Sequence, residues 1–70
     1  MQKIRSEVTG TVWKVQVKEG QPVAADEVLI IVESMKMEIP IVAESAGVVS
    51  EIYVGEGDLI ADDQLVIQLD

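Results

Sequence analysis

The sequence contains no cysteine and no histidine among its 70 residues. Without cysteine it cannot form a disulfide, and without either residue type a zinc site is disfavoured. A serine–histidine–aspartate triad is excluded, and no side chain has an ordinary pKa near neutrality that would suit a general base. Enzymatic activity would have to rest on carboxylates, a lysine or a hydroxyl alone, and an independent enzyme is the class of protein that we expect least.

Basic residues are also scarce, with five Lys and Arg against 13 Asp and Glu and a formal net charge of −8. Nucleic acids and anionic lipid surfaces are polyanions, so both are disfavoured as partners. No apolar run is long enough to span a bilayer, and the first residues lack the hydrophobic region of a signal peptide. These features predict a soluble, cytoplasmic protein that binds neither nucleic acid nor a membrane.

Aromatic residues are few as well. Phe is absent and Trp and Tyr occur once each, so the large apolar residues are mostly Val, Ile and Leu. Val and Ile are stiff at χ1 and favour strands over helices. A chain of 70 residues is long enough for one small domain. The composition predicts a single all-β domain over residues 1–70.

The sequence contains an internal repeat. Residues 10–33 align without a gap with residues 47–70, at an offset of 37 (47 − 10). The matched Gly and Asp residues mark turns, which chance similarity between two β-rich segments would scatter. We therefore predict quasi-twofold internal symmetry, with two copies of one unit in the domain. The identical pairs are Gly10/Gly47, Val12/Val49, Val17/Val54, Glu19/Glu56, Gly20/Gly57, Ala24/Ala61, Asp26/Asp63 and Ile30/Ile67.

The alternation of apolar and polar residues predicts the faces of the strands. In the first copy, Trp13, Val15 and Val17 should share one face. Later in the same copy, Leu29 should face away from Ile30.

Strands this short cannot bury a face alone. Two sheets packed face to face, or a flattened barrel, would solve that problem. Pro40 lacks an N–H group, so it suits an edge strand or a position that points away from the hydrogen-bonded ladder.

Residues 33–38 should form the tip of a hairpin between the two copies. A strand runs into Ser34, and a further apolar run begins at Ile39. The tip contains no Gly, Asn or Asp, so we expect a type I turn rather than a primed two-residue turn.

Lys36 lies at this tip and is the only basic residue from position 19 onward. Met35 and Met37 bracket it and are the only methionines apart from Met1. Exposed methionines at a turn have no evident benefit for folding, but their flexible, polarisable side chains suit contact with a partner. We interpret Lys36 as a residue that is presented for modification by another protein.

Each of these residues has an alternative interpretation. Lys36 could be an ordinary solvated turn lysine, and Met35 and Met37 could be core residues. Glu33 and Glu38 could keep the strand ends soluble, or they could contact a modifying enzyme. An exposed lysine is almost entirely protonated at neutral pH, and the sequence offers no nearby base, so modification would need a separate enzyme.

The run Glu33-Ser34-Met35-Lys36-Met37-Glu38 resembles the biotin attachment motif of the biotinyl/lipoyl carrier domains, in which Met-Lys-Met presents the modified lysine. The segments Gly10-Thr11-Val12 and Gly55-Glu56-Gly57 extend the resemblance to both sides of the motif. Ser34 departs from the Ala or Val that is commonest at its position, and lipoyl members usually carry Asp-Lys-Ala at the turn. The resemblance implies a flattened β-barrel or sandwich of two four-stranded antiparallel sheets with quasi-twofold symmetry. The lysine would lie at a hairpin tip, opposite the chain termini.

The resemblance also implies a function, that of a biotin carrier protein. A biotin protein ligase would attach biotin covalently to Lys36, with Met35 and Met37 as the flanking motif residues. The carrier would move carboxyl groups between a biotin carboxylase and a carboxyltransferase. A lipoyl carrier or dual biotin/lipoyl attachment protein, serving acyl or aminomethyl transfer, is one alternative, and an unmodified β interaction module is another. The residues recognised by the ligase would be Glu33, Ser34 and Glu38.

Overall fold

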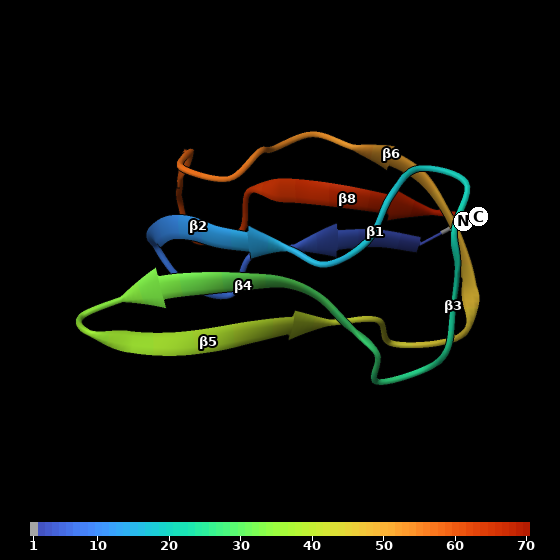
Figure 1. Ribbon diagram of the computed structural model, residues 1–70, viewed down its shortest axis with the longest axis horizontal. Helices are drawn as coiled ribbons and strands as arrows, with labels where there is room; N and C mark the ends of the chain where they lie inside the picture. The colour runs from blue at the N-terminus through green and yellow to red at the C-terminus, as the bar shows by residue number, and fades with distance from the viewer. Residues whose placement is uncertain (1) are drawn as a thin grey trace.

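The computed structural model describes residues 2–70, and all regular structure within them is β-strand (Figure 1). This confirms the predicted all-β class. The strands are β1 (Gln2–Arg5), β2 (Gly10–Val15), β3 (Pro22–Val23), β4 (Val28–Ser34), β5 (Met37–Val42), β6 (Gly47–Ile52), β7 (Leu59–Ile60) and β8 (Leu65–Leu69).

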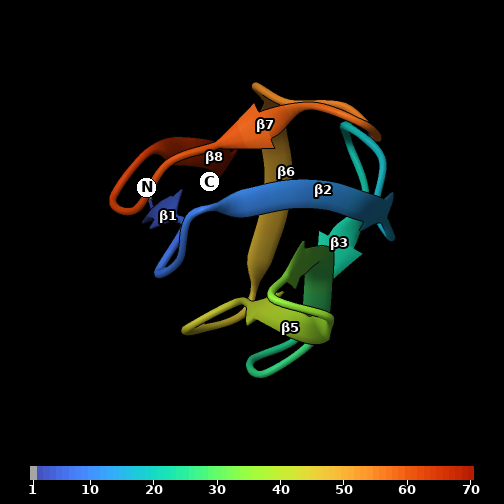
Figure 2. The same ribbon diagram turned by 90° about the vertical axis from the view of Figure 1, so that its left-hand side faces the viewer.

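The strands form two four-stranded sheets in which every pairing is antiparallel. One sheet has the order β1-β8-β6-β3 and the other has the order β5-β4-β2-β7. Figure 2 looks along the long axis and shows β5 and β7 on opposite sides of β2. The core between the sheets is aliphatic: Leu29, Ile30, Ile67 and Leu69 are each 0% exposed. Burial of one such side chain stabilises the fold by about 1.5–3 kcal/mol.

The repeat in the sequence is a symmetry of the structure. Replacing each strand of one sheet by the strand 37 residues away gives the other sheet in the same order. The turns follow the same rule, since φ is 88° at Gly20 and 93° at Gly57, and 67° at Asp26 and 69° at Asp63. The symmetry also relates β1 to β5, although both strands lie outside the two matched sequence segments.

Each copy of the repeat completes the backbone hydrogen bonding of the other. The Glu19 carboxylate accepts a hydrogen bond from the Ile52 N–H at 3.2 Å. Its counterpart Glu56 accepts one from the Val15 N–H at 3.3 Å. The two copies therefore depend on each other, as two halves of one small core would.

Bulges in the strands make two of the predicted faces wrong. The register of β2 against β4 shifts between Val12 and Lys14. As a result Val12 is 1% exposed and Trp13 is 43% exposed, so Trp13 does not share the inner face with Val17. A second bulge next to Leu29 turns that side chain into the core. An extra residue in one strand shifts the alternation, and the alternation of the sequence does not reveal it.

The hairpin of β4 and β5 lies at one end of the long axis. β5 is an edge strand and contains Pro40, as predicted. At the opposite end Gln2 pairs with Leu69, so the two ends of the described chain lie together (Figure 1). The turn between β4 and β5 therefore points away from both ends of the chain.

Candidate functional site

The turn between β4 and β5 contains two residues. Ser34 pairs with Met37, which leaves Met35 and Lys36 to reverse the chain. Their φ angles are 50° and 65°, and two positive values are the mark of a type I′ turn. The predicted type I turn is therefore wrong. The pairing of β4 with β5 leaves only two residues for the reversal, and a primed turn matches the twist of the flanking strands.

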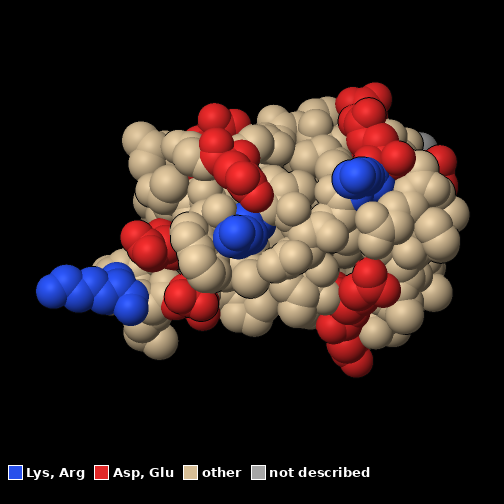
Figure 3. All heavy atoms as spheres, in the orientation of Figure 1, with Lys and Arg blue, Asp and Glu red and all other residues tan. Residues whose placement is uncertain are grey.

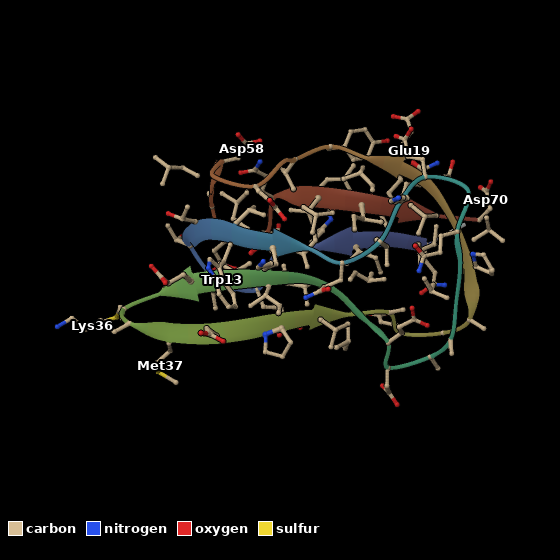
Figure 4. The ribbon with its side chains drawn as sticks, viewed as in Figure 1. Trp13, Glu19, Lys36, Met37, Asp58 and Asp70 are labelled. Atoms are coloured by element: carbon tan, nitrogen blue, oxygen red, sulfur yellow. The ribbon has the colours of Figure 1, made fainter. Side chains whose placement is uncertain are left out.

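This turn holds Lys36 away from the body of the molecule. A residue other than Gly at positive φ costs of order 1–3 kcal/mol, and persists only where the surrounding structure fixes it. Here the paired strands on both sides fix it. Figure 4 shows the Lys36 side chain pointing outward beyond the tip. In the same orientation, Figure 3 shows a basic side chain that protrudes there from a surface carrying many acidic groups.

Both methionines of the motif are exposed. Met35 is 91% exposed and Met37 is 64% exposed, so the interpretation of them as core residues is wrong. They give the tip an apolar surface on either side of an exposed amine. Water solvates such a surface poorly, and it is therefore suited to burial against another protein.

The base of the hairpin is anchored through Thr9 and Gly10, which were not among the predicted site residues. The Ser34 hydroxyl donates a hydrogen bond to the Thr9 carbonyl oxygen at 3.0 Å, and Ser34 is half-buried. A Cβ atom on Gly10 would lie 2.5 Å from the carbonyl oxygen of Glu33. Only glycine allows this approach of β2 to the end of β4. The match between Gly10 and Gly47 in the repeat was the available signal.

Glu33 and Glu38 lie directly opposite each other on the two strands, and both are exposed. Like charges in a directly opposed pair destabilise a sheet. The pair places two carboxylates close behind the Lys36 turn. It therefore gives the hairpin a negative flank below its single positive tip.

The site is convex. A cavity of about 120 Å³ lies between β1 and β5, but the part of its lining that comes from β5 starts at Ile39, and none of residues 33–38 lines it. Among residues 2–70 there is no group of three or more His, Cys, Asp or Glu that could hold a metal ion. That part of the chain also has no helix long and apolar enough to cross a membrane. The geometry suits a residue that is presented to a partner rather than a pocket that encloses a ligand.

Comparison with known proteins agrees with this geometry. The biotin/lipoyl family model, described as biotin-requiring enzyme, matches residues 2–69. The biotin/lipoyl attachment protein of Bacillus subtilis (strain 168) is 41% identical over 63 residues, which cover 90% of this chain and 86% of that protein. The biotinylated protein TB7.3 homolog of Mycobacterium leprae (strain TN) is 43% identical over 63 residues, which cover 90% of this chain and 89% of that protein.

Two solved structures show the same fold. The urea carboxylase of Kluyveromyces lactis matches with a TM-score of 0.94 and 33% identity, over 99% of this chain and 6% of that chain. The lipoyl domain of the 2-oxoglutarate dehydrogenase complex of Azotobacter vinelandii matches with a TM-score of 0.76 and 33% identity, over 90% of this chain and 80% of that chain.

The chain belongs to the biotin/lipoyl domain family, which confirms the resemblance seen in the sequence. It is a non-catalytic carrier domain of this family.

Proposed function

We propose that the protein is a biotin carrier and that biotin is attached covalently to Lys36. The observation that carries the proposal is the position of this lysine at the tip of a two-residue turn, between two exposed methionines. The amine is the part of the hairpin that a second protein would reach first (Figure 4). The attachment joins the Lys36 Nζ atom to the biotin carboxyl group as an amide, which removes the positive charge of the lysine.

The residues of the turn fit a long, covalently attached arm. The tip is convex, so no side chain among residues 2–70 obstructs the arm, and the positive φ angles keep its root facing outward. When bound, biotin supplies the ring nitrogen that accepts and releases a carboxyl group. The domain contributes placement: it holds the root of the arm on a fixed hairpin and confines the search of the arm to a small volume.

The Met-Lys-Met sequence and the named relatives favour biotin over lipoate. Met35 and Met37 match the biotin attachment motif, whereas lipoyl members usually carry Asp and Ala there. The M. leprae relative is named as a biotinylated protein. The name of the B. subtilis relative includes both cofactors, and a lipoyl domain shares the fold, so lipoate is the second candidate.

The partners proposed for the carrier are a biotin protein ligase, a biotin carboxylase and a carboxyltransferase. The similarity to urea carboxylase supports the biotin carboxylase and the carboxyltransferase as partners, because a small part of that carboxylase chain has the fold of this domain. The ligase is required because an exposed lysine amine is almost entirely protonated at neutral pH and needs an enzyme to deprotonate it and supply an activated acyl group. We propose the cytoplasm as the place where these partners meet.

The first test is the intact mass of the protein after co-expression with a biotin protein ligase in biotin-replete cells. We expect one biotinyl group per chain, and none on the Lys36→Arg variant. The matched control is Lys18→Arg, which removes a lysine outside the hairpin and should leave biotinylation unchanged. An unmodified wild-type chain, or a modified Lys36→Arg variant, would overturn the proposal.

The same measurement with a lipoate ligase in place of the biotin ligase separates the two cofactors, because their adducts differ in mass. A lipoyl adduct alone would replace the proposed carrier with a lipoyl carrier. If neither ligase gives an adduct, the domain would be an unmodified interaction module.

A further inference from the structure

The two sheets have the same backbone arrangement, but the side chains on their outer faces differ in chemistry. On the sheet that carries the hairpin, Pro40 lies opposite Ile31, and Ile31 lies opposite Lys14. Trp13 occupies the bulge beside Lys14 and is exposed. We call Trp13, Ile31 and Pro40 the outer strip. Its residues follow one line across three neighbouring strands, β2, β4 and β5.

The symmetry-related positions of the other sheet are polar. Lys3 lies opposite Gln68, and Gln68 lies opposite Glu51. Ser50 occupies the equivalent bulge, 37 residues after Trp13. Since the same backbone is built there with polar side chains, the fold itself does not require an apolar outer strip. In the strip Trp13 and Pro40 are exposed and Ile31 is half-buried, and apolar side chains grouped on a solvent-facing surface mark contact surfaces.

The charges near the outer strip indicate the chemistry of a partner. Glu33 and Glu38 form the second pair from Ile31 and Pro40 toward the tip, which is the next pair on the same face, and both are exposed. The Lys14 ammonium lies 5.6 Å from the centroid of the Trp13 ring, over the strip itself. The strip therefore carries one cation over Trp13, and its side toward Lys36 is acidic. The acidic side is complemented by a partner surface on which Arg or Lys lies beside an apolar area.

The outer strip is also close to the modification site. Pro40 is four residues from Lys36 in the sequence, a distance of about 13 Å along a strand. Figure 4 shows Trp13 in the half of the molecule that is nearer to Lys36. A standard protein interface buries about 800 Å² on each partner, which corresponds to a patch roughly 30 Å across. A partner centred on the hairpin would therefore cover the strip.

We propose that the outer strip is the docking surface for the enzyme that acylates Lys36, and that this enzyme presents an apolar surface flanked by basic side chains. The inference rests on the proposed function. An acylating enzyme must reach the lysine amine, which is one side chain's length from the backbone, so its body must contact the hairpin directly. An enzyme that acts on the loaded cofactor works at the end of a longer arm, and the domain surface can stay further away.

The test replaces two of the three strip residues with those that the other sheet carries at the same positions, in the double variant Trp13→Ser, Ile31→Gln. We expect the KM for the domain in ligase-catalysed biotinylation to rise at least about tenfold, with kcat unchanged, because a buried tryptophan is a frequent hot spot of interfaces. The matched control, Ser50→Ala with Gln68→Ala on the opposite sheet, should keep the wild-type KM and kcat.

Two further measurements keep the inference falsifiable. The single variant Trp13→Ser changes a side chain that is already exposed, so it reports on docking even if the double variant does not fold. In the Lys36→Arg domain, which cannot be acylated, addition of the ligase should shift the NMR signal of the Trp13 indole N–H. This signal is unique because the chain has one tryptophan. The amide signals of Ser50 and Gln68 should not shift.

The possible failures are distinct. A wild-type domain that no ligase acylates would refute the proposed function. A wild-type domain that is acylated normally, with folded strip variants that are acylated equally well, would refute the docking surface alone. So would NMR shifts confined to the opposite sheet, or a strip that joins two copies of this chain in solution while its replacement leaves the acylation kinetics unchanged.

Discussion

At the scale of single residues, the turn combines an unfavourable backbone with an exposed functional group. Met35 and Lys36 both have positive φ, although neither residue type favours it. The turn that carries the candidate modification site is therefore less stable than a turn with residues that favour positive φ. Such costs concentrate at functional sites. This explains why turn preferences alone led to the wrong turn type.

The variant Met35→Asn should separate the effect of residue 35 on the stability of the turn from its effect on the modification of Lys36. Asn tolerates positive φ and is favoured in type I′ turns, so we expect the free energy of unfolding to rise by about 0.5–1 kcal/mol. Biotinylation of Lys36 should slow, because the apolar side chain before it is lost. Urea denaturation measures the first effect and ligase kinetics the second.

The control for this variant is Met35→Leu, which keeps an apolar side chain and the backbone strain. It should leave the stability within about 0.5 kcal/mol of wild type. An Asn variant that is less stable than the Leu variant would show that the turn is not held at positive φ in solution.

At the scale of elements, the approach of β2 to the end of β4 positions the hairpin. Gly10→Ala should destabilise the domain by about 1–3 kcal/mol, because the new Cβ would meet the Glu33 carbonyl at 2.5 Å, within a paired strand. The symmetric variant Gly47→Ala would meet the carbonyl of Asp70 at 2.6 Å. Glu33 is paired with a strand on each side, whereas Asp70 lies just beyond β8 and exchanges backbone hydrogen bonds with Val48, so this change should cost less.

These two variants also differ in their expected effect on the site. Gly10→Ala should lower the rate of biotinylation at temperatures where it is fully folded, whereas Gly47→Ala, at the opposite end of the molecule, should not. Thermal unfolding followed by circular dichroism gives the stabilities, and ligase kinetics gives the rates. Equal losses of biotinylation in both variants would show that the base of the hairpin has no special role.

Much of this element-level structure could be predicted from the sequence. The offset of 37 residues gave the symmetry, and the edge position of Pro40 followed from its missing N–H. The bulges at Trp13 and Leu29 could not be predicted, because the alternation of apolar and polar residues does not reveal an extra residue in one strand. The contact of Ser34 with Thr9 could not be predicted either, because it joins strand ends 25 residues apart.

At the scale of the whole molecule, two copies of one unit share a core and have diverged at their surfaces. The crossed hydrogen bonds of Glu19 and Glu56 tie each copy to the other. Glu19→Ala and Glu56→Ala should each cost about 0.5–1.5 kcal/mol in the free energy of unfolding. Because the copies are interdependent, unfolding should stay a single cooperative transition in both variants.

Calorimetry checks this expectation, since the calorimetric and van't Hoff enthalpies should agree. Two separate transitions would show that the copies fold independently. By contrast the surfaces of the copies differ, because the apolar outer strip and the Met-Lys-Met turn occur in one half only. Symmetry therefore accounts for the stability of the domain, and the departures from symmetry indicate its function.

The central claim is that Lys36 is presented for acylation by another protein. The most direct measurement is peptide mapping by mass spectrometry of wild-type protein incubated with biotin protein ligase, ATP and biotin. The account predicts a single biotinylated peptide, with the modification on Lys36. Biotin on Lys3, Lys14 or Lys18, or no modification at all, would contradict it.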